Sequence, residues 1–397
     1  MSFEGGLYGG ATGGATGGAT GGATGGATGG ATGGWGDGYG PLVGEGLNRF
    51  RGACIDPGDT KVRKLEPRAD DHDHAHVKRW DPWVRSYLCA QTLISGLHFK
   101  VDKAQAAQAT GFRVTMSATL PLKDKSGRTE QVEVVMLERP RAEAFEEQVA
   151  KVLEWADLRE ERLPEIIPQC SNALAFWSTL LPLHTERLRN TREVLEAAVQ
   201  LAMFVEMRFK HEFACWRPVD YSPQVQPMIT TPGHGALPSG HCVESYVIKE
   251  VLQALLGIDP KNADDDALRQ QFARVAARVS TNRVIAGVHF PIDNVAGRLL
   301  GVVLGRYFAF CCGAPSFPPG VDAWHAGAFL GEQCPGSIEF EPGEQSIVED
   351  DRPAYYRYDK VSGLDLLAAP ESVLQPLWTS ARDELQSLAL LRQPKPA

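Results

Sequence analysis

The stretch HGALPSGHCVESY, from His234 to Tyr246, places two histidines seven residues apart on either side of a Pro-Ser-Gly turn. Helically spaced apolar residues follow and end at a glycine, which predicts a helix over residues 241–257. Ser239 and Gly240 then stand at the start of this helix, where main-chain N–H groups lack helical partners and attract anions. The stretch therefore predicts a helix N-terminus that holds an anion near two imidazoles.

The same periodicity predicts further helices on both sides of this stretch. They cover residues 80–96, 141–163, 191–211, 264–287, 289–310 and 370–392. Residues 111–138 instead alternate around a Lys-Ser-Gly turn, which predicts a short β-hairpin. Residues 313–360 are rich in Gly and Pro and are predicted to be loop. The predicted fold is mainly α: a helical bundle with a short β-hairpin and an irregular C-terminal wrap.

Composition limits the kinds of partner. A formal net charge of −9 over 397 residues offers nucleic acid no general attraction, so any anion site is a local cluster of cations. The apolar stretch Leu299–Gly305 is bracketed by arginines and is too short to cross a bilayer. The N-terminus has no basic and apolar leader, and the eight cysteines form no C-x-x-C pair. We expect a reduced, cytoplasmic protein without a membrane or nucleic-acid partner.

Three separate blocks carry candidate anion ligands. Lys210 and Arg217 lie in KHEFACWRP, the PSGH turn follows, and NRVIAGVHFPID contains Arg283, His289 and Asp293. Each block alone has a plainer explanation, such as solvated charges at a helix end, a turn, or a salt bridge between Arg283 and Asp293. Taken together, two guanidinium forks, one lysine and a helix N-terminus favour a cradle for a tetrahedral oxyanion.

The order and spacing of these blocks, K-x6-RP, PSGH and R-x5-H-x3-D over residues 210–293, resemble those of a known superfamily. It unites type 2 phosphatidic acid phosphatases with vanadium-dependent haloperoxidases, and the resemblance implies their type of helical bundle. The helices predicted around these blocks are consistent with that bundle, and the resemblance does not cover the remaining third or more of the chain. One departure is Asn282, because the phosphatases of this superfamily usually have serine before the arginine of the third block.

The resemblance implies a role for each matching residue. The groups that would bind oxygens of the anion are Lys210, Arg217, Ser239, Gly240 and Arg283. His289 would be the metal ligand of vanadate, or the nucleophile of a phosphatase. His241 would be the acid–base group, and Asp293 would orient His289. The acid that orients the acid–base histidine in the family cannot be placed in this sequence.

Halide preference depends on His234, five residues before Ser239. Bromoperoxidases and iodoperoxidases tend to have histidine at the matching position, and fungal-type chloroperoxidases have phenylalanine. The alternative is a loop histidine that falls there by chance. Several haloperoxidases have tryptophan three residues before the cradle lysine, where this chain has Met207. On balance the chain resembles a bacterial bromoperoxidase.

The predicted function is that of a vanadate-dependent haloperoxidase. With orthovanadate as cofactor, it would use hydrogen peroxide to oxidise bromide or iodide to a hypohalite equivalent that halogenates a small organic acceptor. One alternative is a soluble phosphatase acting through a phosphohistidine at His289. A second is a non-catalytic oxyanion-binding or assembly protein. We also expect a homo-oligomer, because helical members of the family often self-associate.

Three segments are predicted along the chain. Residues 9–34 are Gly-Gly followed by six Ala-Thr-Gly-Gly repeats, so residues 1–45 are predicted to be a flexible tail, with an adhesive or assembly segment as the alternative. Residues 46–312 would form the helical-bundle catalytic domain. Residues 313–397 would be a loop-rich extension whose terminal helix packs on the same domain. Asp71–His76, DHDHAH, is either a metal clip or, as we favour, a solvated polar loop.

Overall fold

The computed structural model describes most of the chain from residue 80 to residue 388. The described residues are 45–46, 49–50, 80–102, 111–122, 128–171, 174–184, 186–259, 261–314, 324–347, 351–361 and 373–388. Residues 1–44 of the predicted tail and the Asp71–His76 segment lie outside them. Among the described residues, no helix combines the length and apolarity needed to cross a membrane.

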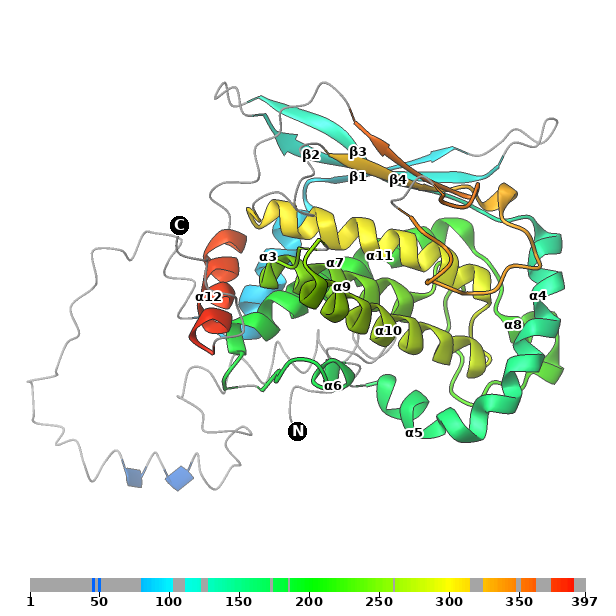
Figure 1. The fold of residues 1–397 in the computed structure, drawn as a ribbon, viewed down its shortest axis with the longest axis horizontal. Coiled ribbons are helices and arrows are strands. Elements are labelled where there is room, and N and C mark those ends of the chain that lie inside the picture. Colours follow the sequence, from blue (N-terminus) through cyan, green and yellow to red (C-terminus); the bar gives the residue numbers. More distant parts are fainter. Residues whose placement is uncertain are drawn as a thin grey trace, which may run out of the picture.

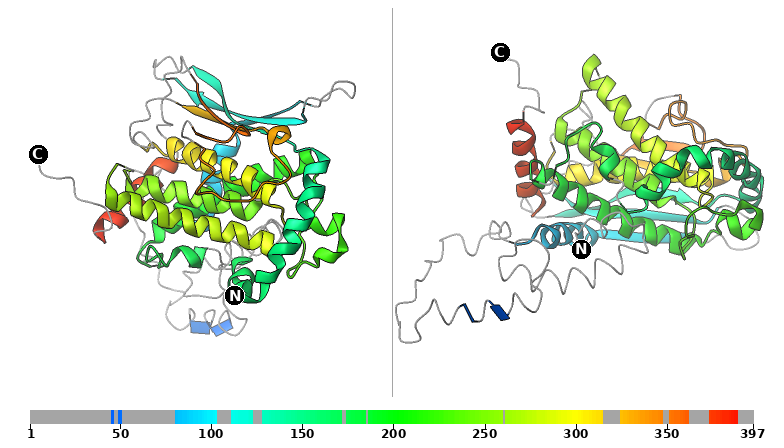
Figure 2. Two further views of the ribbon diagram at one scale, coloured as in Figure 1. Left: turned by 45° about the vertical axis from the view of Figure 1, so that its right-hand side comes forward. Right: turned by 90° about the horizontal axis from the view of Figure 1, so that it is seen from below.

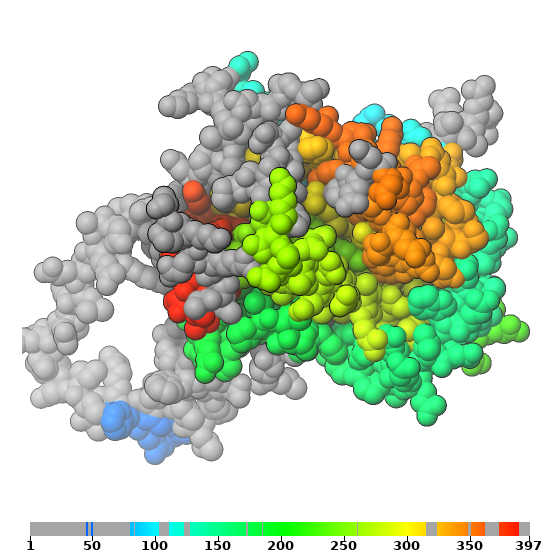
Figure 3. Space-filling view, viewed as in Figure 1, coloured from blue at the N-terminus to red at the C-terminus, as the bar shows by residue number. Residues whose placement is uncertain are grey.

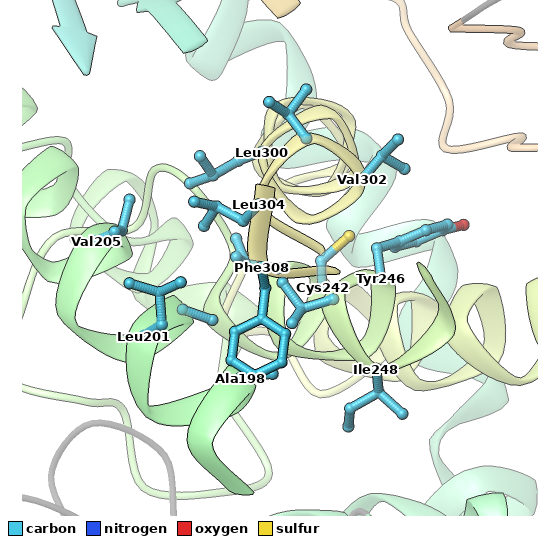
Figure 4. Packing of buried hydrophobic residues seen from close by; sticks show 14 of the residues in the cluster. Ala198, Leu201, Val205, Cys242, Tyr246, Ile248, Leu300, Val302, Leu304 and Phe308 are labelled. Atoms are coloured by element: carbon cyan, nitrogen blue, oxygen red, sulfur yellow. The ribbon is translucent and has the colours of Figure 1, made fainter. Parts of the chain in front are cut away.

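Four long helices form the centre of the molecule (Figure 1). They are α7 (Arg189–Phe213), α9 (Gly240–Leu256), α10 (Ala263–Ile285) and α11 (Pro291–Cys311). Apolar side chains from three of them meet in the core, among them Leu201 of α7, Ile248 of α9 and Phe308 of α11 (Figure 4). Nearly every residue of α9 and α11 is buried, which explains the continuous apolar runs in their sequences.

Glycines allow α9 and α11 to approach closely. A Cβ at Gly301 would lie 2.6 Å from the carbonyl oxygen of Val243, and one at Gly297 would lie 2.9 Å from that of Ser239. Both distances are too short for a side chain, so these two positions require glycine. The contact brings the beginning of α11 next to the beginning of α9.

The remaining helical elements surround this centre. They are α3 (Pro82–Ile94), α4 (Ala142–Trp155), α5 (Arg159–Gln169), α6 (Leu174–Trp177), α8 (Pro218–Tyr221) and α12 (Leu374–Ser387), with 3₁₀ turns η3 (Ala156–Leu158), η4 (Pro223–Val225) and η5 (Gly331–Gln333). In Figure 1, α4 and α5 lie at one end of the molecule and α12 at the other. The predicted helices, including the terminal one, are confirmed within one to several residues at their ends, with one exception. The single helix predicted over residues 141–163 is divided into α4, η3 and α5, and it continues to Gln169.

A five-stranded sheet covers one side of α11 (Figures 1 and 2). Its strands are β1 (Leu97–Asp102), β2 (Arg113–Pro121), β3 (Thr129–Glu138), β4 (His325–Phe329) and β5 (Tyr356–Lys360), in that spatial order. All neighbours are antiparallel except β3 and β4, which run parallel with Val135 opposite Gly327. A Cβ at Gly327 would lie 2.6 Å from Val303 of α11, so the sheet packs directly on this helix.

The mainly α prediction is confirmed, and the β content is larger than expected. The predicted hairpin is β2–β3, but it forms the middle of the sheet rather than an isolated unit. The prediction that residues 313–360 are loop is wrong at β4 and β5. β4 has the sequence HAGAF and becomes a strand by pairing with β3, nearly 200 residues earlier, which local periodicity does not reveal.

The described C-terminal elements pack on the helical bundle. Tyr356 of β5 donates a hydrogen bond to the carbonyl oxygen of Val295 in α11 (2.7 Å). Trp378 and Leu385 of α12 belong to the same buried cluster as α7 and α9. In Figure 3 the segment from residue 324 to residue 361 lies beside α10 on the same face. The proposed segment boundaries themselves stay a prediction.

Candidate functional site

The first turn of α9 is the centre of the candidate site. Ser239 is its N-cap residue, and its main-chain N–H donates to the carbonyl oxygen of Asp293 at 3.0 Å. The Ser239 side chain does not cap the helix; its Oγ is buried and has no hydrogen-bond partner. A Cβ at Gly240 would lie 2.5 Å from Glu206 Oε1, so only glycine fits there. The turn therefore presents free donors at the positive end of a helix dipole.

Lys210, in the last turn of α7, reaches the loop that precedes α9. Its Nζ lies 3.3 Å from the carbonyl oxygen of Ala236 and also donates to that of Pro238. The side chain is 1% exposed. Burial lowers the pKa of Lys210 to about 8, against the attraction of Glu206. The buried ammonium group has lost its hydration, and Glu206 compensates for this loss only in part. A bound anion would therefore stabilise the charged form of Lys210.

Arg217 joins the first and third sequence blocks to the loop that precedes the PSGH turn. Its hydrogen-bonding neighbours are the carbonyl oxygens of Val288 (2.7 Å), His234 (3.1 Å) and Gly235 (3.3 Å), and the ring nitrogens His289 Nε2 (2.9 Å) and His234 Nδ1 (3.2 Å). Burial lowers the pKa of Arg217 to about 10. The guanidinium remains charged at neutral pH and fixes both histidines relative to the loop before α9.

His289 and Asp293 make the predicted pair. His289 Nδ1 lies 3.1 Å from Asp293 Oδ2, which also accepts the main-chain N–H of Phe290 at 2.9 Å. Burial, Arg217 and Lys210 lower the pKa of His289 well below its usual range, so the imidazole is neutral. With the Nδ1 proton assigned to the contact with Asp293, Nε2 keeps its lone pair toward Arg217. An unprotonated Nε2 in this position can bind or attack an electrophilic centre.

Arg283 and His241 are both held by the end of α5. Arg283 Nη2 donates to Gln169 Oε1 at 2.8 Å and to the carbonyl oxygen of Ile166 at 3.2 Å. His241 Nε2 lies 3.2 Å from the main-chain carbonyl oxygen of Gln169. Arg283 Nε is buried without a partner. Gln169 thus contacts a candidate anion ligand and the candidate acid–base group at once.

Gln169 contacts His241 through its main-chain carbonyl oxygen and can orient the imidazole. This residue was not predicted from the sequence. It ends a helix 72 residues before His241 and belongs to no recognisable motif. Asn282, the residue that departs from the phosphatase pattern, points to the same place: its Nδ2 lies 3.1 Å from both Gln169 Oε1 and Glu165 Oε2. Asn282 therefore joins α10 to α5. Arg283 contacts α5 too, so the alternative of a salt bridge to Asp293 is wrong.

Two buried carboxyl groups near the cradle were also missed. Glu206 of α7 is 1% exposed, and Glu244 of α9 is 4% exposed. Burial raises the pKa of Glu206 to about 7 and that of Glu244 to about 8, although Lys210 attracts both. The only sequence signal was the spacing of Glu206 four residues before Lys210, which is common on exposed helix surfaces.

His234 and His241 stay neutral near physiological pH. Burial lowers the pKa of His234 to about 4 and that of His241 to about 3, and nearby arginines add to the effect. His234 Nδ1 lies 3.1 Å from the carbonyl oxygen of Gly235 as well as facing Arg217. Both imidazoles line the site and are partly accessible, so either can exchange a proton with a bound molecule.

The residues present fit a tetrahedral oxyanion such as phosphate or vanadate. Three buried cations converge with the first turn of α9, and two buried donors, Ser239 Oγ and Arg283 Nε, have no hydrogen-bond partner in the protein. Buried donors without partners are costly unless a ligand satisfies them. Among the described residues, no three His, Cys, Asp or Glu side chains are arranged to hold a metal ion. The roles of the individual residues stay predictions.

Part of the chain is similar to known proteins. Residues 194–313 match the PAP2 superfamily. The vanadium-dependent bromoperoxidase of Ascophyllum nodosum is 30% identical over 91 residues, covering 18% of this chain and only 16% of the bromoperoxidase. The crystal structure of a bacterial vanadium-dependent iodoperoxidase matches 43% of each chain with 17% identity and a TM-score of 0.27. Residues 194–313 contain every predicted site residue.

Proposed function

We propose that the PAP2 superfamily domain of this chain is the catalytic unit of a vanadate-dependent haloperoxidase. The reaction is the oxidation of bromide or iodide by hydrogen peroxide, followed by halogenation of a small organic acceptor. The observation that carries the proposal is the neutral His289, whose Nε2 faces a cradle of buried cations. The presence of His234 beside Arg217, and the local similarity to a bromoperoxidase, favour this activity over phosphate-ester hydrolysis.

In this proposal the site residues bind the oxyanion and orient its histidine ligand. Lys210, Arg217 and Arg283 neutralise the oxyanion, and Ser239 Oγ and the amide of Gly240 donate hydrogen bonds to it. Asp293 holds His289 in the tautomer that leaves Nε2 free to ligate vanadium. Bound vanadate supplies a Lewis acid that activates hydrogen peroxide toward halide.

Proton movement is assigned to His241. Its neutral imidazole accepts a proton from hydrogen peroxide as the peroxide binds and returns it to the leaving oxygen. The contact with the Gln169 carbonyl favours a proton on Nε2, which would leave Nδ1 as the base. His234, held by Arg217, lies where it can contact the halide.

The second candidate is a phosphatase that forms a phosphohistidine at His289. The same cradle supports it, because a trigonal bipyramidal vanadate resembles the transition state of phosphoryl transfer. In that case His289 Nε2 attacks phosphorus and His241 protonates the leaving alcohol. The PAP2 superfamily match supports both activities equally.

One experiment separates them. Protein freed of bound phosphate and metal is assayed for bromination of monochlorodimedone with peroxide and bromide, with and without orthovanadate, and for p-nitrophenyl phosphate hydrolysis in parallel. Vanadate-dependent bromination is expected, and a chloride control tests the contribution of His234. Ester hydrolysis inhibited by vanadate, without bromination, would establish the phosphatase instead.

The third candidate is an oxyanion-binding or assembly protein that depends on the Gly-rich repeat. Simple binding requires no acid–base histidine, so the presence of both His241 and His289 weighs against it. Full activity after removal of residues 1–45 would eliminate this candidate. We also propose a homo-oligomer, which sedimentation of the full chain would test.

A further inference from the structure

The carboxylate of Glu206 lies next to the proposed oxyanion site, where a second negative charge disfavours anion binding. Its carboxylate presses against Gly240, the first residue of α9, close enough that a Cβ there would lie 2.5 Å from Oε1 and 3.0 Å from Oε2. Oε2 is buried and has no hydrogen-bond partner. A helix N-terminus attracts carboxylates and oxyanions alike. Glu206 and the bound oxyanion therefore compete for the same positive helix end.

Several ionisable groups lie within electrostatic reach of this carboxylate. Lys210 and Arg217 attract it, and Glu244 repels it. Cys242 of α9 is also within electrostatic reach of Glu206, and Asp293 of α11 acts on Lys210. Within the described site, Glu206, Glu244 and Asp293 thus oppose Lys210, Arg217 and Arg283. When all six are ionised their formal charges cancel, which weakens the attraction of the site for a dianion.

We infer that Glu206 takes up a proton when an oxyanion binds, so that oxyanion affinity in this protein is coupled to proton uptake. The inference rests on the oxyanion site of the proposed function and adds Glu206 as a positioning residue that tunes the charge of that site. The proton comes from solvent and binds to a carboxylate oxygen of Glu206; no bond to the anion forms. Burial of Glu206 favours its neutral form, and the approach of a second negative charge favours it further.

The sign of the pH dependence follows from this coupling. Since binding takes up a proton, affinity falls as the pH rises through the pKa of Glu206 in the free protein, about 7. A glutamine at position 206 has no charge at any pH, so the variant loses less affinity than the wild type in alkaline solution. The pH dependence that remains in the variant comes from Lys210 and Glu244, whose pKa values are both about 8. If Glu206 had a purely structural role, its replacement would instead lower the oxyanion affinity at all pH values.

Sulfate is the probe, because it stays a dianion and contributes no titration of its own. Binding is measured by calorimetry from about pH 6 to about pH 9. Two buffers with different ionisation enthalpies count the protons taken up. Glu206→Gln is expected to bind sulfate like the wild type at the acidic end and roughly tenfold more tightly at the alkaline end. The matched control is Glu196→Gln.

Glu196 is a suitable control because it shares helix and chemistry with Glu206. Burial raises its pKa to about 7 as well, but it lies ten residues earlier in α7, about 15 Å along the helix axis. Glu196→Gln is expected to leave sulfate affinity unchanged. Should Glu206→Gln not fold, wild-type calorimetry decides the matter: proton uptake near zero between about pH 7 and about pH 8, where uptake by Glu206 is expected to be largest, overturns the inference.

The remaining outcomes separate this inference from the proposed function. Sulfate affinity of Glu206→Gln that equals or falls below the wild-type value at every pH overturns only the role of Glu206. Absence of sulfate binding by the wild type at any pH overturns the oxyanion site and the inference with it. A proton-coupled site without bromination supports the inference and contradicts the haloperoxidase alone.

Discussion

At the scale of single residues, chemistry in this protein depends on polar groups that are buried before any ligand is bound. Ser239 Oγ, Arg283 Nε and Asp293 Oδ1 are buried without hydrogen-bond partners. Such groups reduce the free energy of unfolding, so their presence points to binding rather than to structural stability. Removing one of them should therefore separate the effects on binding from those on stability.

Ser239→Ala should weaken oxyanion binding without destabilising the fold. The Oγ makes no hydrogen bond in the protein, so its loss removes a desolvation cost, and the melting temperature is expected to stay equal or rise. Phosphate affinity is expected to fall roughly tenfold, by about 1.4 kcal/mol. Calorimetry with phosphate and a thermal melt measure both. A lower melting temperature with unchanged affinity would mean that Oγ has a structural partner instead.

His289→Ala and His241→Ala should have different effects. The first removes the proposed ligand of vanadium and is expected to abolish both vanadate binding and turnover. The second removes only the acid–base group, so most vanadate affinity is kept and much activity is lost, roughly 10²–10⁴-fold. Equilibrium dialysis with vanadate and the bromination assay measure the two properties. Wild-type turnover by either variant contradicts the role given to that histidine.

The depressed pKa of His241 also affects acid stability. Folding lowers this pKa from its ordinary value of 6.5 to about 3, so between these values the unfolded chain binds a proton that the folded chain does not. The histidine therefore contributes stability above pH 6.5 that is lost as the pH falls toward 3. Urea unfolding at several pH values should show a shallower acid loss for His241→Asn than for the wild type. Parallel profiles would contradict the neutral imidazole.

At the scale of elements, the ends of helices assemble the site. The last turn of α7 supplies Lys210, the first turn of α9 supplies Ser239 and Gly240, and the beginning of α11 supplies Asp293. The end of α5 closes the group through Gln169. Because helix termini carry unsatisfied main-chain groups, their convergence produces a polar site inside an otherwise apolar bundle.

Gln169→Ala should show that α5 positions the site from outside the motif. The change frees Arg283 of one hydrogen bond, loosens its orientation and shifts the end of the helix that contacts His241. Phosphate affinity and kcat/KM are both expected to fall roughly tenfold. Ile167→Ala, at a half-exposed position of the same helix, is the matched control and should match the wild type. Equal effects of both changes would indicate general loosening of α5.

At the scale of the whole molecule, the described elements that follow α11 form part of the hydrophobic core. β4 pairs with β3 in the sheet that covers α11, and α12 contributes Trp378 to the cluster shared by α7 and α9. Sheet and bundle therefore bury each other's apolar faces. A chain without these elements would expose α11 and an open edge of β3.

A truncated chain ending at residue 312 is accordingly expected to aggregate or to lose cooperative unfolding. It lacks the buried Phe329, Tyr356 and Trp378 and the hydrogen bond from Tyr356 to Val295. Each large buried aromatic contributes about 3–5 kcal/mol, so the three together are comparable to the whole stability of an ordinary domain. Circular dichroism and thermal unfolding are the measurements. A cooperative transition like that of the full chain would mean that residues 46–312 fold alone.

The helices, the hairpin and the three motif blocks could be predicted from the sequence, because each depends on residue spacing within one helix or turn. The order and spacing of the blocks can be read directly along the chain. This made it possible to predict Lys210, Arg217 and His289 as site residues. Three features could not be predicted: β4 completes a sheet with β3, Gln169 holds Arg283 and His241, and Glu206 lies against Gly240. These facts arise from contacts between distant segments, and burial, which sets the charge of each group, exists only once those segments have packed.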